Sequence, residues 1–261
     1  MIKVKWKLMF LALPYAAGAV VCKLILFYFV KFEGIVALSD IALLVSAGVF
    51  LLGFMLAGVM SDYKESERIP GEIASAIESL EETCTNLATK TNYDLNFVRK
   101  GTFDLATSIH DWFLEKISDT EVFERLTRFN LVINELDRIG AAATILGRLF
   151  NEMSILRRIV TRAGVISRTG FLATGYALLE TLIVVIFAIL MIVKFAHIIG
   201  AVVVTFFITL VYVYMYKLIS DIDDPFEYGE QEGSAEVPLF PLTEYIERVE
   251  KRINAHTSDS I

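Results

Sequence analysis

Residues 41–68 decide the fold of this 261-residue chain: IALLVSAGVFLLGFMLAGVM, followed directly by SDYKESER. The first part contains no charged side chain, and about twenty helical residues span a hydrocarbon core of about 30 Å. The second part mixes acidic and basic side chains, which require water. We therefore predict that a membrane helix ends, and an aqueous segment begins, next to Met60.

The composition of the whole chain agrees with a membrane protein. Hydrophobic residues make up 55% of it, and its mean hydropathy of +0.57 lies outside the range of ordinary soluble domains. The formal net charge of −7 and the lack of a basic run argue against nucleic acid as a partner. Cys22 and Cys84 fall in segments of different kinds, so we expect no disulfide.

Three further segments are long and apolar enough to cross a bilayer: residues 8–30, 171–193 and 198–218. With residues 41–60 they predict four transmembrane helices in two hairpins. Most Lys and Arg residues flank these segments on one side, which places both termini in the cytoplasm. We expect a multi-pass protein of the inner or plasma membrane.

Residues 62–169, between the hairpins, have helical periodicity and no strand signal of weight. We expect the helix to restart after Pro70-Gly71, and Thr91–Asp94 and Ser118–Glu121 have the form of helix starts. The predicted core stripes are 73, 77, 80, 84 and 87, then 105, 109, 112 and 113, then 122, 126, 129, 133 and 136, and finally 145, 149, 153, 156 and 160.

These patterns predict an all-α membrane protein with four transmembrane helices in two hairpins and a cytoplasmic bundle of about four helices between them. The expected domains are a first transmembrane hairpin (1–61), the helical bundle (62–169), a second transmembrane hairpin (170–219) and an acidic cytoplasmic tail (220–261). Within the tail, an extended segment over 238–241 should precede a short amphipathic helix over 243–254.

No enzyme motif is present in the sequence. The three histidines are widely separated, and there is no nucleophile elbow, phosphate-binding glycine loop or metal-ligand spacing. We therefore expect no enzymatic activity.

Two ionisable residues, Lys23 and Glu180, lie inside predicted spans. A charge at membrane depth costs about 2.5–3.5 kcal/mol on insertion scales, so function is the default hypothesis. For Lys23, we consider two hypotheses about equally: that it lines a polar cavity or subunit contact, or that its side chain snorkels to the outer surface. For Glu180 we favour a functional role because its side chain is too short to snorkel far. Their depths differ by roughly 10 Å, which argues against a direct pair.

The second span presents Leu43, Ala47, Phe50 and Phe54 on one helical face. Around an oligomer axis, this face would form an apolar ring that gates by dewetting. The alternative is packing against lipid or other helices, which is the commoner role of an aromatic pair in a membrane helix.

The densest acidic cluster follows the fourth span and contains Asp221, Asp223, Asp224, Glu227 and Glu230. Oxygen ligands at close spacing suit a hard cation such as Ca²⁺. The interpretation that we favour is a solvated tail, or docking of these acids on the basic residues Arg157, Arg158 and Arg162.

Several of these features together resemble the bestrophin and bestrophin-like membrane proteins. They are the two hairpins separated by roughly a hundred helical residues, the segment DYKE at 62–65, the Arg-rich helix before the third span, and Asp224-Pro225-Phe226 after the fourth. The resemblance lies in architecture more than in motifs. It implies a pentameric channel whose second span lines the pore, and a calcium clasp of acidic residues near a Pro-Phe pair.

We therefore expect a homo-oligomeric ion channel whose partners are the lipid bilayer, further copies of the chain and inorganic ions. The ion's sign is open, although acidic residues on the cytoplasmic side favour cations. One alternative is a non-conducting scaffold or sensor whose cytoplasmic bundle binds a protein partner. Another is a proton-coupled transporter that uses Glu180.

Overall fold

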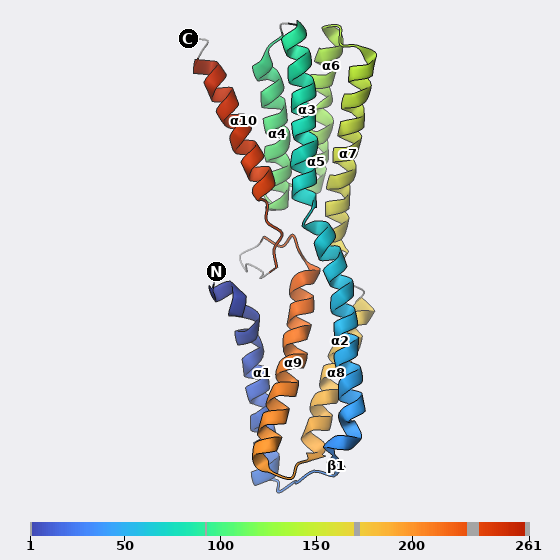
Figure 1. Cartoon of the computed structure of the whole chain (residues 1–261), viewed down its shortest axis with the longest axis vertical. Coiled ribbons are helices and arrows are strands. Elements are labelled where there is room, and N and C mark those ends of the chain that lie inside the picture. The colour runs from blue at the N-terminus through green and yellow to red at the C-terminus, as the bar shows by residue number, and fades with distance from the viewer. Residues whose placement is uncertain (1, 92, 170–172, 229–234, 259–261) are drawn as a thin grey trace. The chain divides into compact units, whose positions relative to one another are not determined.

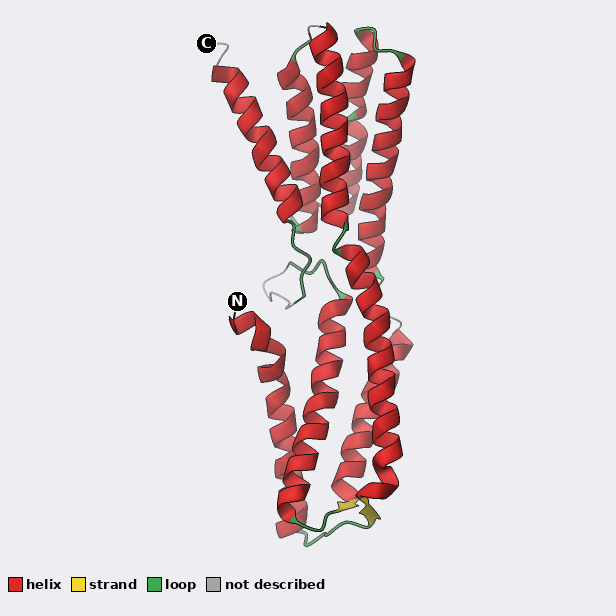
Figure 2. Ribbon diagram, in the orientation of Figure 1, coloured by secondary structure: helices red, strands yellow, loops and turns green. Residues whose placement is uncertain are grey.

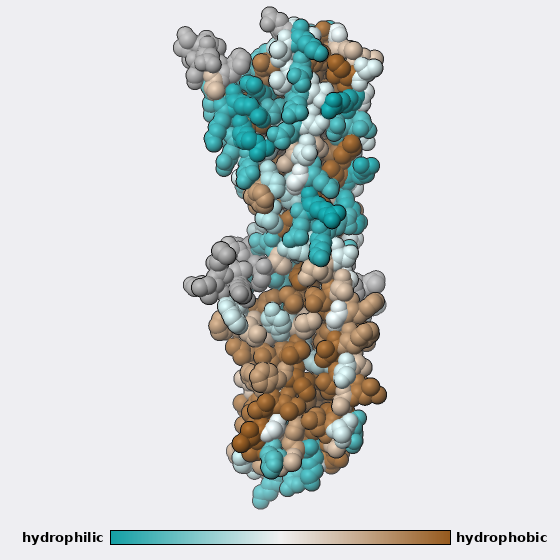
Figure 3. Space-filling model, in the orientation of Figure 1, coloured by the Kyte–Doolittle hydropathy of each residue, from teal (hydrophilic) through white to brown (hydrophobic). Residues whose placement is uncertain are grey.

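The computed structural model describes residues 2–91, 93–169, 173–228 and 235–258, nearly all of them in helices (Figures 1 and 2). Two compact units divide the chain. We call them the apolar unit, with residues 2–63, 173–225 and Ala235, and the polar unit, with residues 64–91, 93–169, 226–228 and 236–258. On the face shown in Figure 3, hydrophobic residues cover most of the apolar unit, and hydrophilic residues cover most of the polar unit.

The apolar unit is built from four long helices, α1 (Ile2–Tyr28), α2 (Leu38–Ser66, whose last three residues belong to the polar unit), α8 (Ala173–Ile192) and α9 (Ile198–Asp223). All four are long and apolar enough to cross a membrane. They overlap the predicted spans but differ at their ends. Helix α1 begins six residues before Leu8 and ends two before Val30, α2 continues six residues beyond Met60, and α9 continues five beyond Leu218. Residues 171 and 172 of the third predicted span lie outside the described residues.

Three of these helices share one core, which contains residues of α2 (Leu52, Met55, Val59), α8 (Leu179, Ile186, Leu190) and α9 (Tyr212, Ile219, Ile222). Helix α1 packs mainly along α9 (Figure 1). The two short connections, after α1 and after α8, meet as a parallel strand pair, β1 (Val36–Ala37) with β2 (Val193–Lys194). This strand pair was not predicted, because two residues are too few to form a recognisable strand pattern.

The polar unit contains α3 (Ile69–Thr91), α4 (Leu95–Phe113), α5 (Asp119–Arg128), α6 (Asn130–Arg138), α7 (Ala143–Arg168) and α10 (Phe240–Ser258). Helix α3 is central and packs on α4, α7 and α10. Its predicted stripe is confirmed, since Ile73, Ile77, Leu80, Cys84 and Leu87 are all buried.

The predicted starts of the first two helices of the polar unit are wrong. The break after the second span falls at Glu67-Arg68, and Pro70 is the second residue of α3, where its missing N–H has no helical partner to lose. Thr91 does not cap a helix: it ends α3, and its hydroxyl donates to the Leu87 carbonyl at 3.0 Å. The cap of α4 is Asp94, whose carboxylate accepts from the Asn96 N–H at 2.8 Å.

The cap at Ser118 is confirmed, because its hydroxyl accepts from the Glu121 N–H at 3.3 Å. The single helix predicted after it is instead two, α5 and α6, which meet at Phe129, so residues 64–168 hold five helices rather than about four. The predicted tail helix exists as α10 but begins earlier, at Phe240, and therefore includes Pro241 in its first turn.

Candidate functional site

The uncharged face of α2 is exposed in the single chain. Leu43, Phe50 and Phe54 are 81%, 77% and 70% exposed, and Ala47 is exposed as well. The opposite face packs into the core shared with α8 and α9. Lipid or another copy of the chain can therefore cover the exposed stripe, and its role in a pore stays a prediction.

A close contact between α2 and α9 fixes which face of α2 is buried. The Tyr212 side chain of α9 is buried, and its hydroxyl donates to the Val45 carbonyl of α2 at 2.7 Å. A Cβ atom at Gly48 would overlap with that hydroxyl oxygen. Only glycine leaves room for the tyrosine there, so Gly48 and Tyr212 together hold Phe50 and Phe54 on the exposed side.

Lys23 of α1 has a partner that neither sequence hypothesis named. Its side chain is 4% exposed, and Nζ donates to three carbonyl oxygens at the end of α8: Leu190 at 3.1 Å, Met191 at 2.9 Å and Val193 at 2.7 Å. The last carbonyls of a helix lack intrahelical partners and carry partial negative charge. The ammonium of Lys23 therefore caps α8.

Glu180 belongs to a polar chain between α8 and α9. Its exposed carboxylate accepts from the Tyr216 hydroxyl at 2.9 Å. The Tyr216 ring meets the Tyr176 ring edge-on at 6.2 Å between centroids, and the Tyr176 hydroxyl donates to Asp223 at 2.9 Å. Each carboxylate is thus held by a tyrosine on the neighbouring helix.

The acidic cluster of the tail is divided between the units, with Asp221, Asp223 and Asp224 in the apolar unit and Glu227 in the polar unit. Glu230 lies outside the described residues. Within the described ranges, no group of three or more His, Cys, Asp or Glu side chains is placed to hold a metal ion. Calcium binding stays a prediction that rests on the resemblance.

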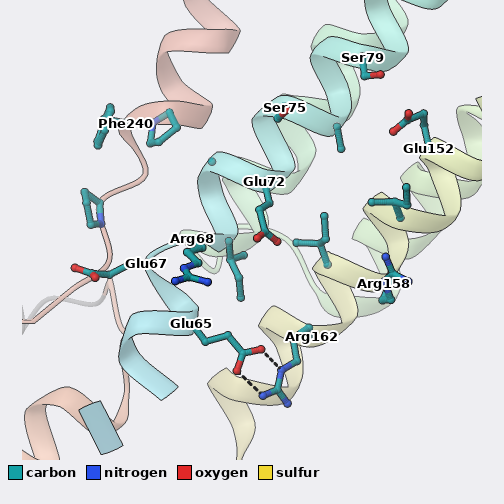
Figure 4. A pocket seen from close by; sticks show the side chains of 17 residues that line it. Glu65, Glu67, Arg68, Glu72, Ser75, Ser79, Glu152, Arg158, Arg162 and Phe240 are labelled. Carbon is teal, nitrogen blue, oxygen red and sulfur yellow. Dashed lines mark hydrogen bonds and ion pairs between the residues drawn. The ribbon is translucent and has the colours of Figure 1, made fainter. Parts of the chain in front are cut away.

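The polar unit holds a charged cavity of about 1230 Å³ between α3, α7 and the start of α10 (Figure 4). At one end of it, the Arg162 guanidinium forms two hydrogen bonds with Glu65, both 2.8 Å long. Arg157 lies outside this lining and donates to the Thr127 hydroxyl at 3.3 Å. Two of the three arginines expected to receive the acidic tail therefore have partners in their own unit. Figure 4 also shows Arg68, Glu72, Glu152 and Arg158 along the cavity.

Solved structures share this architecture. A crystal structure of a bacterial bestrophin homolog from Klebsiella pneumoniae matches 95% of this chain and 97% of its own, with a TM-score of 0.71 and 14% identity. A variant of that protein matches 97% of this chain and 99% of its own, with a TM-score of 0.71 and 15% identity. The chain has the bestrophin fold.

This likeness agrees with the resemblance inferred from the sequence, which lay in architecture rather than in motifs. Another crystal structure, described as that of a membrane protein, also covers 97% of this chain, with a TM-score of 0.70 and 15% identity. No protein-family model and no curated protein matches the chain. At this level of identity, the comparison with bestrophin homologs establishes the fold alone.

Proposed function

We propose that this chain assembles as a pentameric ion channel in the inner or plasma membrane, with α2 lining the pore. The shared bestrophin fold supports this, because the resemblance to bestrophins implies such a pentamer. In this proposal, α1, α2, α8 and α9 cross the bilayer as two hairpins. Both termini and the polar unit then lie in the cytoplasm, on the side that the Lys and Arg residues favour.

The observation that carries the proposal is the exposed, uncharged stripe of α2. Leu43, Ala47, Phe50 and Phe54 recur at alternating spacings of four and three residues, so they stay on one side of the helix. In a symmetric assembly, Phe50 and Phe54 form two stacked apolar rings about 6 Å apart along the helix. Such a constriction expels water and blocks ions until it widens.

Exposure alone does not identify a pore, because α1 and α9 also expose aromatic rings. Phe10 of α1 is 66% exposed and Phe207 of α9 is 58% exposed. We assign these rings to lipid. They provide the matched control, since the same two Phe→Ala substitutions remove two exposed phenyl rings in each case.

We propose cations as the permeant ions. The stripe carries no charge, so it does not select by sign. Asp62 lies two residues beyond Met60, where the apolar part of α2 ends, and the chain as a whole has a formal net charge of −7. Negative potential along the entrance concentrates cations there.

The test combines the mass of the detergent-solubilised complex with ion flux from liposomes. We expect a protein mass of five times the 29.3 kDa chain, and K⁺ flux above Cl⁻ flux. Phe50→Ala/Phe54→Ala should raise K⁺ flux about tenfold, as a barrier lower by about 1.4 kcal/mol would. Phe10→Ala/Phe207→Ala should leave flux unchanged. A monomer, or no flux of either ion with any of these proteins, would refute the channel.

A further inference from the structure

The break between α5 and α6 creates a groove in the polar unit that the channel proposal does not use. This cavity of about 360 Å³ is lined by residues of α4, α5 and α6 (Figure 1 shows these helices). Its floor contains Leu105, Phe129 and Val132, which are 2%, 4% and 6% exposed. Phe129 is the residue between the end of α5 and the start of α6, so the helix break places its side chain in the floor of the groove.

A glycine lets α4 approach α6 closely at this groove. A Cβ atom at Gly101 would lie 2.8 Å from Cγ2 of Val132. Any larger residue would push the two helices apart or displace Val132. The groove is therefore a defined concavity with an apolar floor.

Two positively charged side chains without an ion pair in the described part of the chain lie on the rim of the groove. Lys100 and Arg128 are exposed, and neither has an ion pair or side-chain hydrogen bond within the described part of the chain. A third cation, Arg125, is already engaged: its guanidinium binds Glu121 at 2.7 Å and the Ser108 hydroxyl at 3.4 Å. Lys100 and Arg128 are therefore available to a ligand.

The rim also contains one acidic residue and two apolar ones. Asp104 is exposed, and its carboxylate has no ion pair in the described ranges. Phe97 and Leu131 are 37% and 60% exposed, which extends the apolar floor up to the solvent. The unpaired charges sum to one positive charge beside an apolar surface.

We propose that this groove binds a small organic anion whose apolar body is about the size of one or two rings. The body would lie on Leu105, Phe129 and Val132, and the anionic group between Lys100 and Arg128. Small-molecule sites of about 300–1,000 Å³ combine an apolar lining with a few polar groups in this way. A partner helix would need a groove several turns long. A bound ligand would bridge α4 to the α5–α6 break, and this inference does not depend on ion conduction.

The charge arrangement predicts which anions bind. A single negative charge pairs with Lys100 and Arg128 through charge-assisted hydrogen bonds. Asp104 repels a second negative charge, so monoanions should bind more tightly than dianions of the same shape. Removing the Asp104 carboxylate should therefore strengthen binding.

The experiment measures binding of naphthalene-1-sulfonate to the full-length protein in lipid nanodiscs by titration calorimetry. We expect saturable binding, weakened at least about tenfold by Lys100→Gln/Arg128→Gln, because two charge-assisted hydrogen bonds are lost. Phe97→Ala at the exposed rim should weaken binding severalfold, and Asp104→Asn should strengthen it. Arg148→Gln/Lys251→Gln removes two exposed cations elsewhere in the polar unit and should change nothing.

Three results would overturn the proposal. They are no saturable binding to the wild-type protein, unchanged affinity in Lys100→Gln/Arg128→Gln, and inorganic sulfate binding as tightly as the naphthalene compound. The substituted side chains are exposed, so unfolding midpoints equal to wild type confirm that each variant is folded. The binding experiment does not measure ion flux. A negative result for the anion-binding groove therefore leaves the channel proposal untouched, and a negative flux result leaves the groove proposal untouched.

Discussion

Replacing Lys23 by Met tests how the ends of α1 and α8 are held together. Methionine keeps an unbranched side chain that is one atom shorter and removes the ammonium, so the carbonyl oxygens of Leu190, Met191 and Val193 lose their donor. Hydrogen bonds inside membrane proteins contribute about 0.6 kcal/mol each on average, which gives about 2 kcal/mol for three. Removing one partner of a buried charged interaction costs about 3–5 kcal/mol, which sets the upper end.

We therefore expect Lys23→Met to lower the free energy of unfolding by about 2–5 kcal/mol. The assay is reversible unfolding in mixed micelles, followed by amide hydrogen exchange at the strand pair Val36–Ala37 with Val193–Lys194. Exchange there should accelerate, because the strand pair begins where the capped helix ends.

Lys194→Met is the matched control. Lys194 is exposed and forms an ion pair with Glu33 at 3.4 Å, so its loss should cost less than about 1 kcal/mol. Lys23→Arg should recover part of the stability, because its guanidinium still donates to carbonyls. Equal stability of Lys23→Met and wild type, or an equal loss in Lys194→Met, would refute the capping role.

Three further predictions, two of them with a control substitution, test other parts of the structure. Asp94→Ala should lower the free energy of unfolding by about 1 kcal/mol and Thr91→Ala by much less, because only Asp94 caps α4; equal losses would contradict this. Gly48→Ala should cost about 1–3 kcal/mol by displacing Tyr212, whereas Gly53→Ala, which meets no neighbour within 4 Å, should not destabilise. Glu180→Gln should leave liposome flux unchanged, since glutamine still accepts from Tyr216; loss of a pH-driven uptake would instead favour the transporter.

Periodicity predicted the long helices and the buried stripe of α3 because side-chain spacing records which face is apolar. The same signal could not reveal the break at Phe129. Val122, Leu126, Phe129, Ile133 and Leu136 continue one stripe across it, and all five are buried. A one-residue interruption of the helix leaves the spacing of the apolar residues intact. The groove depends on this interruption and was therefore not predictable from the sequence.

The partner of Lys23 was not predictable for a different reason. Its acceptors are backbone carbonyls 167–170 residues away, and every residue type supplies the same carbonyl group. The sequence shows that a buried lysine needs a partner, but only the fold brings the end of α8 to it. The cap of α4 likewise depends on where α3 stops. Thr91 still belongs to α3, and a threonine inside a helix donates to a carbonyl of its own helix, so Asp94 is the cap.

The exposed stripe on α2 can form a pore only in an assembly of several chains. Helical spacing identifies Leu43, Ala47, Phe50 and Phe54 as one face, and Gly48 beneath Tyr212 explains why the opposite face is buried. Both facts concern atoms of a single copy. A pore, however, is a property of several copies around an axis, because only symmetry converts one exposed ring into a closed constriction. The mass of the complex therefore comes before any flux measurement: it decides whether a change caused by Phe50→Ala/Phe54→Ala can be interpreted as gating.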